Sequence, residues 1–292
     1  MEVFSPIQQV TLPTQHQIWV KRDDLIDPYI SGNKWRKLKY ILATAIQTKR
    51  THLVTFGGAY SNHLVATAAA AARHHLTATA FVRGEEVENE MLLLCRLFGM
   101  ELRFVDRDCY RDKRSLFSKH FGDHGSAYFI DEGGASEQAV EGCREIITEL
   151  PMHFDHIFCA AGTGTTAAGL LREINAQKLQ SKLHVIPVLK GAAFIEKEIA
   201  AYEKNIDQLV LHLDYHFGGY AKTNPELISY IKGFTAATGI LIDPVYTAKM
   251  CYAIKDLFEK GLLKKEEKVL AIHTGGLLGL LGMREKFAGG KA

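Results

Sequence analysis

Lys34 lies directly behind a Ser-Gly-Asn turn and directly ahead of a basic, amphipathic run, in the stretch SGNKWRKL that spans Ser31 to Leu38. A lysine in such a place can be an ordinary solvated charge. It can also be held at the start of a helix as a nucleophile or a base, which are roles that lysine performs when its surroundings fix it. The other polar turns of the chain decide between these alternatives.

A second candidate for chemistry is the run GTGTT, which lies between the apolar stretch HIFCAA and a helix expected to begin near Ala167. Its glycines permit a tight turn, its successive N–H groups converge, and its hydroxyl groups add donors. The positive end of the helix dipole also favours a dianion there. We therefore expect a phosphate site formed by Gly162, Thr163, Gly164, Thr165 and Thr166.

Two kinds of phosphate ligand are excluded because the sequence lacks the residues that bind them. A Walker loop ends in Gly-Lys-Ser or Gly-Lys-Thr, and this run does not. A dinucleotide fingerprint needs an acidic residue about 20 positions further on. Residues 174–195 contain no Asp or Glu. The expected phosphate therefore belongs neither to a P-loop nucleotide nor to NAD.

A third polar turn is FGGAYSNH, in which Gly57 and Gly58 end an apolar stretch and Ser61, Asn62 and His63 open an alanine-rich helix. Ser and Asn are common N-cap residues, so helix capping alone is one interpretation. In the other interpretation, the free N–H groups of this helix start bind the carboxylate of a substrate. The Asn62 amide would then be available to hydrogen-bond a ring oxygen.

Two further turns lie in the C-terminal half. In AIHTGG, a strand-like stretch ends at His273 and Thr274; we interpret His273 as a hydrogen-bonded structural residue and Thr274 as a small neutral hydrogen-bonding group. In DPVYTAKM, Asp243 begins a helix whose first turn carries Tyr246 and Thr247. A capped helix with a partly buried tyrosine is the alternative for that turn.

The elements that position these turns form an α/β pattern. Short apolar, β-rich runs that end in Gly or Asp alternate with longer helix-like segments; the strand-like runs are LVTF, ATAFV, LRFV, AYFI, HIFCA, HVIPVL, LVLHL and KVLAIH. Because these runs are continuously apolar, they predict mainly parallel sheets covered by helices on both faces. Ligands bind at the C-terminal ends of strands in such sheets, which is where the polar turns fall.

Composition bounds the class of partner. With 292 residues, of which 47% are hydrophobic, the chain can bury the cores of two moderate domains. Its net charge of +2, without a long basic block, argues against nucleic acid and favours a small-molecule ligand. Its five cysteines form no C-x-x-C pair and are expected to be reduced thiols. We expect a cytoplasmic protein without a membrane span, because no apolar run approaches ~20 residues and the N-terminus does not resemble a leader.

Together these turns supply what pyridoxal 5′-phosphate requires: a phosphate site, partners for the ring nitrogen and ring oxygen, and a lysine for the Schiff base. In their order along the chain, the motifs SGNKWRKL, FGGAYSNH, GTGTTAAGL, DPVYTAKM and HTGG resemble those of the 1-aminocyclopropane-1-carboxylate deaminase and D-cysteine desulfhydrase family. The resemblance covers nearly the whole chain. It implies the tryptophan-synthase-β-like fold (fold type II), with two three-layer αβα domains and mainly parallel sheets.

The resemblance assigns roles at the cofactor. It implies that Lys34 is the Schiff-base lysine and that Lys37 lies near the phosphate. It implies that Asn62 is the partner of the ring oxygen, that Thr274 is the partner of the ring nitrogen, and that residues 162–166 form the phosphate loop.

The resemblance also assigns roles at the substrate. Ser61, with the backbone amides around Asn62 and His63, matches the site of the substrate carboxylate. Tyr220, in GGYAKTNPEL, and Tyr246 match two active-site tyrosines, either of which could protonate the leaving group.

Three positions bear on which substrate is used. Many family members have Gln where this chain has Tyr60, and the larger tyrosine could reshape the carboxylate pocket. Cyclopropane deaminases resemble one another in having Glu and Leu where this chain has Thr247 and Thr274. A carboxylate keeps the pyridine nitrogen protonated, whereas a hydroxyl group only hydrogen-bonds it. The threonines therefore favour β-elimination of thiolate from D-cysteine over cyclopropane opening.

Two other classes of function stay open at this stage. A β-replacement synthase or dehydratase of the same fold would share the lysine and the phosphate loop, and a non-catalytic protein could carry the cofactor on the same lysine. The expected organisation is a large cofactor-binding domain formed by residues 1–49 and 151–292, and a smaller α/β domain formed by residues 50–150. The expected assembly is a homodimer.

Overall fold

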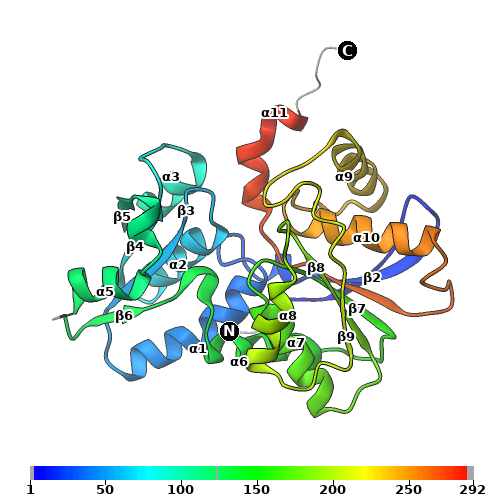
Figure 1. Cartoon of the computed structure of the whole chain (residues 1–292), viewed down its shortest axis with the longest axis horizontal. Coiled ribbons are helices and arrows are strands. Elements are labelled where there is room, and N and C mark those ends of the chain that lie inside the picture. The colour runs from blue at the N-terminus through cyan, green and yellow to red at the C-terminus, as the bar shows by residue number, and fades with distance from the viewer. Residues whose placement is uncertain (1–2, 123, 288–292) are drawn as a thin grey trace. The chain divides into compact units, whose positions relative to one another are not determined.

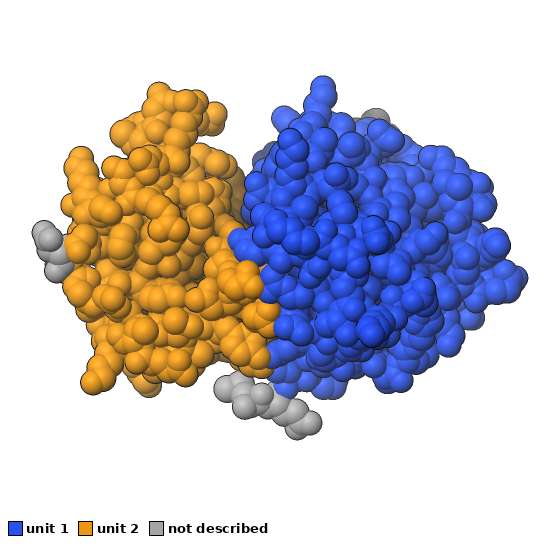
Figure 2. All heavy atoms as spheres, turned by 60° about the horizontal axis from the view of Figure 1, so that its bottom comes forward, with its two compact units in different colours: residues 1–26, 31–33, 143–292 blue, residues 27–30, 34–142 orange. Residues whose placement is uncertain are grey.

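The computed structural model describes residues 3–122 and 124–287, so residues at both ends of the expected large domain lie outside the described part. The chain divides into two compact units. Unit 1 comprises residues 1–26, 31–33 and 143–292, and unit 2 comprises residues 27–30 and 34–142 (Figure 2). The division differs from the expected boundaries in three places: residues 27–30 and 34–49 belong to unit 2, and residues 143–150 belong to unit 1. The unit boundary therefore passes between Asn33 and Lys34.

Unit 1 contains a six-stranded sheet in the order β1-β2-β10-β7-β8-β9. Its strands are β1 (Ile7–Thr11), β2 (Gln17–Lys21), β7 (His156–Ala161), β8 (Lys182–Pro187), β9 (Leu209–Leu211) and β10 (Val269–Ile272). Only the pair β1 and β2 is antiparallel in this sheet; the other neighbours are parallel. The parallel arrangement predicted from the continuously apolar runs is thus present, and β7 is buried along its whole length.

The hairpin of β1 and β2 was not expected from the sequence. Its strands, IQQVT and QIWVK, mix polar and apolar residues: β1 forms an edge of the sheet and is largely exposed, whereas β2 is largely buried and includes the buried Lys21. Only a five-residue connection separates them. A search for continuous apolar runs does not find such a half-exposed edge hairpin.

Helices cover both faces of the unit 1 sheet. Figure 1 shows α9 and α10 on one side of it and α7 and α8 on the other. The helices of this unit are α6 (Glu137–Thr148, which crosses the unit boundary), α7 (Thr165–Ala176), α8 (Phe194–Tyr202), α9 (Pro225–Thr238), α10 (Thr247–Glu259) and α11 (Arg284–Phe287), with the 3-10 helices η1 (Asp23–Leu25) and η3 (Leu277–Met283). The largest apolar core lies between the sheet and helices α9 and α10, where Phe158, Phe234 and Ile254 are fully buried.

Unit 2 contains a four-stranded, wholly parallel sheet in the order β5-β4-β3-β6. Its strands are β3 (His52–Gly58), β4 (Thr77–Arg83), β5 (Met100–Val105) and β6 (Ala127–Phe129). Its helices are α1 (Asn33–Gln47), α2 (Asn62–Arg73), α3 (Glu90–Leu97), α4 (Arg107–Tyr110) and α5 (Lys113–Phe121), with the 3-10 helix η2 (Glu132–Gly134). Phe56, Phe81 and Phe121 pack as an aromatic cluster on this sheet.

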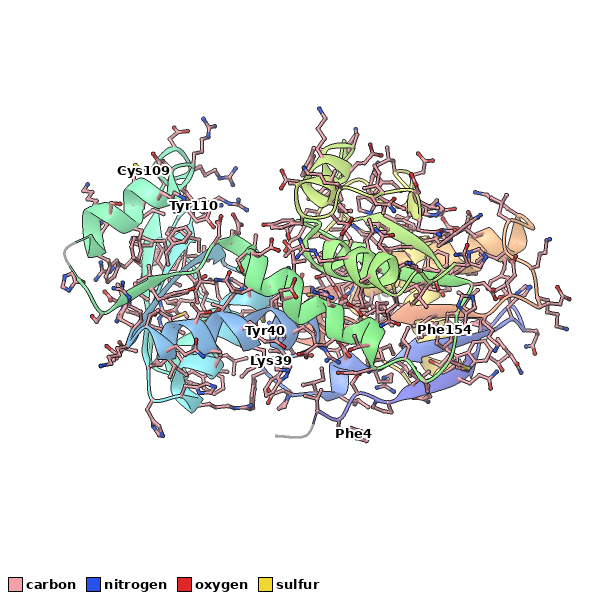
Figure 3. The ribbon with its side chains drawn as sticks, turned by 90° about the horizontal axis from the view of Figure 1, so that it is seen from below. Phe4, Lys39, Tyr40, Cys109, Tyr110 and Phe154 are labelled. Carbon is pink, nitrogen blue, oxygen red and sulfur yellow. The ribbon has the colours of Figure 1, made fainter. Side chains whose placement is uncertain are left out.

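The strand-like runs recognised in the sequence correspond to β3–β10, so the predicted α/β class is confirmed. All five cysteines are free, and Cys109, labelled in Figure 3, is the exposed one. Among the described residues, no helix has both the length and the apolar character needed to cross a membrane.

Candidate active site

The turn before Lys34 packs against the end of strand β10. Gly32 has a φ of +60°, and a side chain there would overlap the carbonyl group of Thr274, so both its conformation and its surroundings require glycine. The Asn33 amide donates to the same Thr274 oxygen at 3.3 Å, and α1 begins at Asn33. Lys34 is therefore the second residue of a helix whose start is tied to a strand end, as expected from the sequence.

Asn33 also contacts the expected phosphate loop, which lies in the same unit. Its Nδ2 donates to Thr166 Oγ1 at 3.0 Å. Asn33 thus connects the end of β10 with the first turn of α7, one residue before Lys34 in the chain. This contact of Asn33 was not expected from the sequence.

The loop at residues 162–166 has the backbone of an anion site. Gly164 occupies the N-cap position of α7 with a φ of +72°, and a Cβ there would come within 3.2 Å of Ile199 Cγ1. No side chain caps the helix. α7 begins at Thr165, two residues earlier than expected, so Thr165 and Thr166 lie in its first turn, and the hydroxyl groups of Thr163 and Thr165 are 3.3 Å apart.

The lack of a side-chain bond from the N-cap residue is shared by α2, and also by α8 and α10. The N-cap residue of α2 is Ser61, and its hydroxyl group makes no capping hydrogen bond. In contrast, α3, α4, α5 and α9 are each capped by an Asn or Asp side chain: Asn89, Asp106, Asp112 and Asn224. The first-turn N–H groups of α2 and α7 are therefore not consumed by their own N-caps, as an anion site at a helix start requires. Ser61 is therefore the N-cap residue of α2 without a capping bond from its hydroxyl group, and its role at the substrate stays a prediction.

Ser61 and Asn62 lie at the C-terminal end of β3, in unit 2. A Cβ on Gly57 would come within 2.9 Å of Ser61 Oγ, so the glycine makes room for the serine side chain. Tyr60, the residue that replaces the usual Gln, is 54% exposed. Its ring is therefore not packed into the core of unit 2.

The His63 side chain is a structural group. Thr55 Oγ1 donates to the Ile130 carbonyl oxygen at 3.1 Å, so it accepts the proton of His63 Nε2 at 2.8 Å. Burial lowers the pKa of His63 well below its ordinary value, and the charges of Lys34 and Lys37 lower it further. His63 is therefore neutral, and its Nδ1 is buried without a hydrogen-bond partner among the described residues.

Lys37 lies three residues after Lys34 and is buried, with 2% of its surface exposed. Its Nζ donates to the Gly133 carbonyl oxygen at 3.2 Å. Gly134 has a φ of +75°, and a Cβ added to it would lie 3.7 Å from Lys37 Cβ. The same Cβ would lie 3.4 Å from His63 Cε1, so the side chains of Lys37 and His63 are close together in unit 2.

The two tyrosines lie together in unit 1. The ring centroids of Tyr220 and Tyr246 are 6.1 Å apart, in an edge-to-face arrangement at 76°. A Cβ on Gly162 would come within 3.2 Å of the Tyr246 hydroxyl oxygen. Tyr246 therefore lies between Tyr220 and the first residue of the expected phosphate loop.

Thr247 does not offer a free hydroxyl group. Its Oγ1 donates to Asp243 Oδ1 at 2.8 Å and accepts from the Asp243 amide at 2.7 Å, and the residue is fully buried. Asp243 also accepts the amides of Val245, Tyr246 and Thr247, each at 2.8–2.9 Å. The expectation that Thr247 serves the cofactor ring is corrected: it belongs to the hydrogen-bonded start of α10. Burial raises the pKa of Asp243 despite these bonds.

At the end of β10, His273 is satisfied by the protein, as predicted. Its Nε2 donates to the Leu241 carbonyl oxygen at 2.7 Å, and its Nδ1 accepts from the Gly275 amide at 3.2 Å. Thr274 is 7% exposed, and in the part of the chain that the structure describes its hydroxyl group makes no hydrogen bond. Thr274 thus remains the candidate for a ring-nitrogen partner.

Comparisons with known proteins identify the family of the chain. The sequence matches the family described as "Pyridoxal-phosphate dependent enzyme" over residues 5–275. It is 33% identical to a putative 1-aminocyclopropane-1-carboxylate deaminase of Pyrococcus abyssi, over 92% of this chain and 87% of that protein. It is 28% identical to the bifunctional D-cysteine desulfhydrase and 1-aminocyclopropane-1-carboxylate deaminase of Arabidopsis thaliana, over 95% of this chain and 76% of that protein.

A solved structure also resembles the chain. It is the crystal structure of an ACC deaminase homologue, which superimposes with a TM-score of 0.86 at 30% sequence identity, over 97% of this chain and 92% of that one. The similarity extends across both units, so the fold as a whole is shared with a solved protein.

Proposed function

Because the chain belongs to the family of pyridoxal-phosphate-dependent enzymes, we propose that it eliminates thiolate from D-cysteine. The overall reaction converts D-cysteine and water into pyruvate, hydrogen sulfide and ammonia. Membership of the family identifies the cofactor as pyridoxal phosphate. The arrangement of this chain's own residues supports thiolate as the leaving group.

The residues present fit the cofactor. The uncapped start of α7, with its left-handed Gly164, would hold the phosphate group, and the Thr163, Thr165 and Thr166 hydroxyl groups would add donors. Lys34 would hold the cofactor as a Schiff base, with Lys37 near the phosphate and Asn62 at the ring oxygen. When bound, the cofactor supplies an electron sink for the negative charge that develops at the substrate Cα.

The choice of substrate rests on the hydrogen-bonding groups at the end of β10 and at the start of α10. The free hydroxyl group there belongs to Thr274, whereas the carboxylate of Asp243 is committed to four hydrogen bonds at the start of α10. A ring nitrogen with a hydroxyl partner is more often neutral, which makes a weaker electron sink. A weaker sink is sufficient for loss of thiolate, a good leaving group, and less suited to opening an unactivated cyclopropane ring.

The remaining residues would perform the proton transfers and hold the substrate. The N–H groups at the start of α2, with the Ser61 hydroxyl group, would bind the substrate carboxylate. The Lys34 amine, once released by the incoming substrate amine, would remove the α-proton as general base. The Tyr220 or Tyr246 hydroxyl group would donate a proton to the departing thiolate.

A second candidate function is 1-aminocyclopropane-1-carboxylate deamination, to 2-oxobutanoate and ammonia. The names of the Pyrococcus and Arabidopsis relatives favour it, and the Arabidopsis name joins both activities. A non-catalytic cofactor-binding protein is a third candidate, against which the pairing of Tyr220 with Tyr246 argues.

A panel of substrates tests the proposal. The purified, cofactor-loaded protein is incubated separately with D-cysteine, L-cysteine and 1-aminocyclopropane-1-carboxylate, and sulfide, pyruvate and 2-oxobutanoate are measured. We expect sulfide and pyruvate in equal amounts from D-cysteine, and little product from the other two. Predominant 2-oxobutanoate would establish the second candidate instead, and no turnover of any of the three would leave only the cofactor assignment.

Two further properties concern the compartment and the assembly. We infer a cytoplasmic enzyme, because five free thiols suit a reducing compartment. We also infer a homodimer, which the family resemblance implies. Light scattering of the cofactor-loaded protein tests the assembly. A mass of two chains would support the homodimer, and a mass of one chain would contradict it.

A further inference from the structure

Lys249, in the first turn of α10, is a buried cation that the proposed function leaves without a role. The residue is fully buried, and its Nζ donates to the carbonyl oxygens of His216 and Gly219, each at 2.8 Å, and of Val188 at 3.4 Å. An ammonium group has three N–H donors and no acceptor, so three converging carbonyl groups match it completely.

The charge of this group is maintained in the protein. Burial lowers the pKa of Lys249 to about 8, with Asp243 acting to raise the pKa and Lys286 to lower it. The group therefore stays largely protonated at neutral pH and keeps all three donors. Burying a cation costs free energy unless hydrogen bonds compensate it. We therefore expect the Lys249 ammonium group to hold its carbonyl partners firmly.

The segment that Lys249 binds has an unfavourable backbone. Phe217, Gly218, Gly219 and Ala221 all have φ values between 52° and 121°, so left-handed residues lie on both sides of Tyr220. For non-glycine residues such as Phe217 and Ala221, this region costs on the order of 1 kcal/mol each. An isolated chain would not keep this conformation.

Two of the three carbonyl groups are at the turns that set this conformation. The His216 carbonyl accepts the Gly219 amide at 3.0 Å, and the Gly219 carbonyl accepts the Lys222 amide at 3.2 Å. The third, Val188, directly follows strand β8. Lys249 therefore ties both turns to a strand end, and Gly219 lies directly before Tyr220.

We propose that Lys249 is a positioning residue that holds residues 216–221 and thereby fixes the location of the Tyr220 hydroxyl group relative to the reacting bond. The proposal rests on the proposed role of Tyr220 in the reaction. The α10 start also carries Tyr246, whose ring contacts Tyr220, so one helical turn places both tyrosines. Arginine cannot replace this lysine, because its planar donors diverge and cannot converge on three carbonyl groups.

A double-mutant cycle tests this role in the loaded enzyme. Lys249→Met removes the donors and keeps most of the volume, and Tyr220→Phe removes only the hydroxyl group. We expect Lys249→Met to lower kcat about 10- to 100-fold with KM little changed, because a small misplacement of a reacting group costs that much. In the Tyr220→Phe background, the same change should lower kcat less than about twofold. Equal losses in both backgrounds would overturn the proposal.

Hydrogen exchange gives a readout that does not depend on the substrate. In Lys249→Met, the amides of residues 216–222 should exchange faster, while those of β10 should exchange as in the wild type. Lys255→Met is the matched control, because Lys255 lies on the same helix and pairs with Glu259 at 2.7 Å instead. Unchanged exchange in residues 216–222 would overturn the proposal even if the proposed substrate were correct, and faster exchange would support it even if the substrate were wrong.

A second variant covers the case in which Lys249→Met does not fold. Gly218 is exposed and has a φ of +92°, so Gly218→Ala strains the same segment without touching Lys249 or the core. We expect it to lower kcat as Lys249→Met does, and to lose this effect in the Tyr220→Phe background. A Gly218→Ala protein with faster exchange in the segment and wild-type kcat would show that the position of Tyr220 does not depend on the segment.

Discussion

The Thr247 hydroxyl group and the Asp243 carboxylate are bound to each other, with Oγ1 donating to Oδ1 at 2.8 Å and the Asp243 amide donating back to Oγ1 at 2.7 Å. Both residues are almost completely buried. A position that separates subclasses of the family in sequence is thus part of a helix start in this chain. Its effect on the cofactor must pass through Asp243 or be absent.

Thr247→Glu should therefore destabilise the protein rather than convert it to a cyclopropane deaminase. The new carboxylate would face the buried Asp243 and lose the hydroxyl partner, a change that costs about 3 kcal/mol. Urea unfolding measures the loss. Thr247→Ser, which keeps the hydroxyl group, should lie within about 1 kcal/mol of the wild type. A stable Thr247→Glu protein with increased 2-oxobutanoate formation would contradict this account of α10.

Thr274 should be the threonine that matters for chemistry. Thr274→Val keeps the shape and removes the hydroxyl group, so turnover of D-cysteine should fall about tenfold while the protein still binds the cofactor. Thr274→Ser serves as the control and should retain most of the activity. If Thr274→Val were as active as the wild type, the ring-nitrogen assignment would fail.

Gly162→Ala should weaken cofactor binding. An added methyl group would press against the Tyr246 hydroxyl oxygen at 3.2 Å and shift either the phosphate loop or the tyrosine. We expect the dissociation constant for pyridoxal phosphate to rise at least about tenfold, as for a loss of 1.4 kcal/mol. Gly233→Ala, in the interior of α9 where a Cβ meets open space, should leave that constant unchanged. Equal affinities for the two variants would argue against the loop as the phosphate site.

A row of three histidines predicts how stability depends on pH. His184 Nε2 lies 2.9 Å from His156 Nδ1, and His184 Nδ1 lies 2.9 Å from His212 Nε2. In each hydrogen bond, one of the two nitrogens carries the proton and the other accepts it. Burial, followed by the charges of His212, His156 and Lys182, lowers the pKa of His184 to about 3. Burial also lowers the pKa of His212.

Because the folded-state pKa of His184 lies below that of the unfolded chain, the unfolded state binds more protons between pH 6.5 and about 3. Stability should therefore fall as the pH falls through this window. Between pH 6.5 and 4, His184→Phe should lose about 3 kcal/mol less than the wild type, at about 1.4 kcal/mol per pH unit. Urea titrations at both pH values measure this, with the partly exposed His153→Gln as the control. Parallel losses in wild type and His184→Phe would refute the assignment.

The sequence predicts most of the fold because strands in parallel sheets are continuously apolar. Strands β3–β10 and the helices after β3 and β7 follow from that pattern, whereas the hairpin of β1 and β2 does not, because polar residues interrupt both strands. The candidate site residues are recognisable as polar turns at strand ends, but their hydrogen-bond partners are not. Asn33 and Lys249 act through contacts with residues 30 or more positions away, which spacing alone does not reveal.

Asp243 is identified from the sequence as the start of a helix. An aspartate directly before a proline at a helix start is typical of a capping residue, and the carboxylate does accept three amides of the α10 start. No comparable signal exists for Lys249, since a buried lysine looks like any other lysine on a helix.

The central claim is that Lys34, at the tied start of α1, carries the cofactor and performs the base chemistry. The most direct measurement is reduction of the loaded protein with borohydride, followed by proteolysis and mass spectrometry to locate the lysine that carries the pyridoxyl group. The account predicts the label on Lys34, and predicts that Lys34→Ala has neither the visible absorption band of the Schiff base nor turnover of D-cysteine. A label on Lys37 or any other lysine, or a Lys34→Ala protein that keeps both the band and turnover, would contradict it.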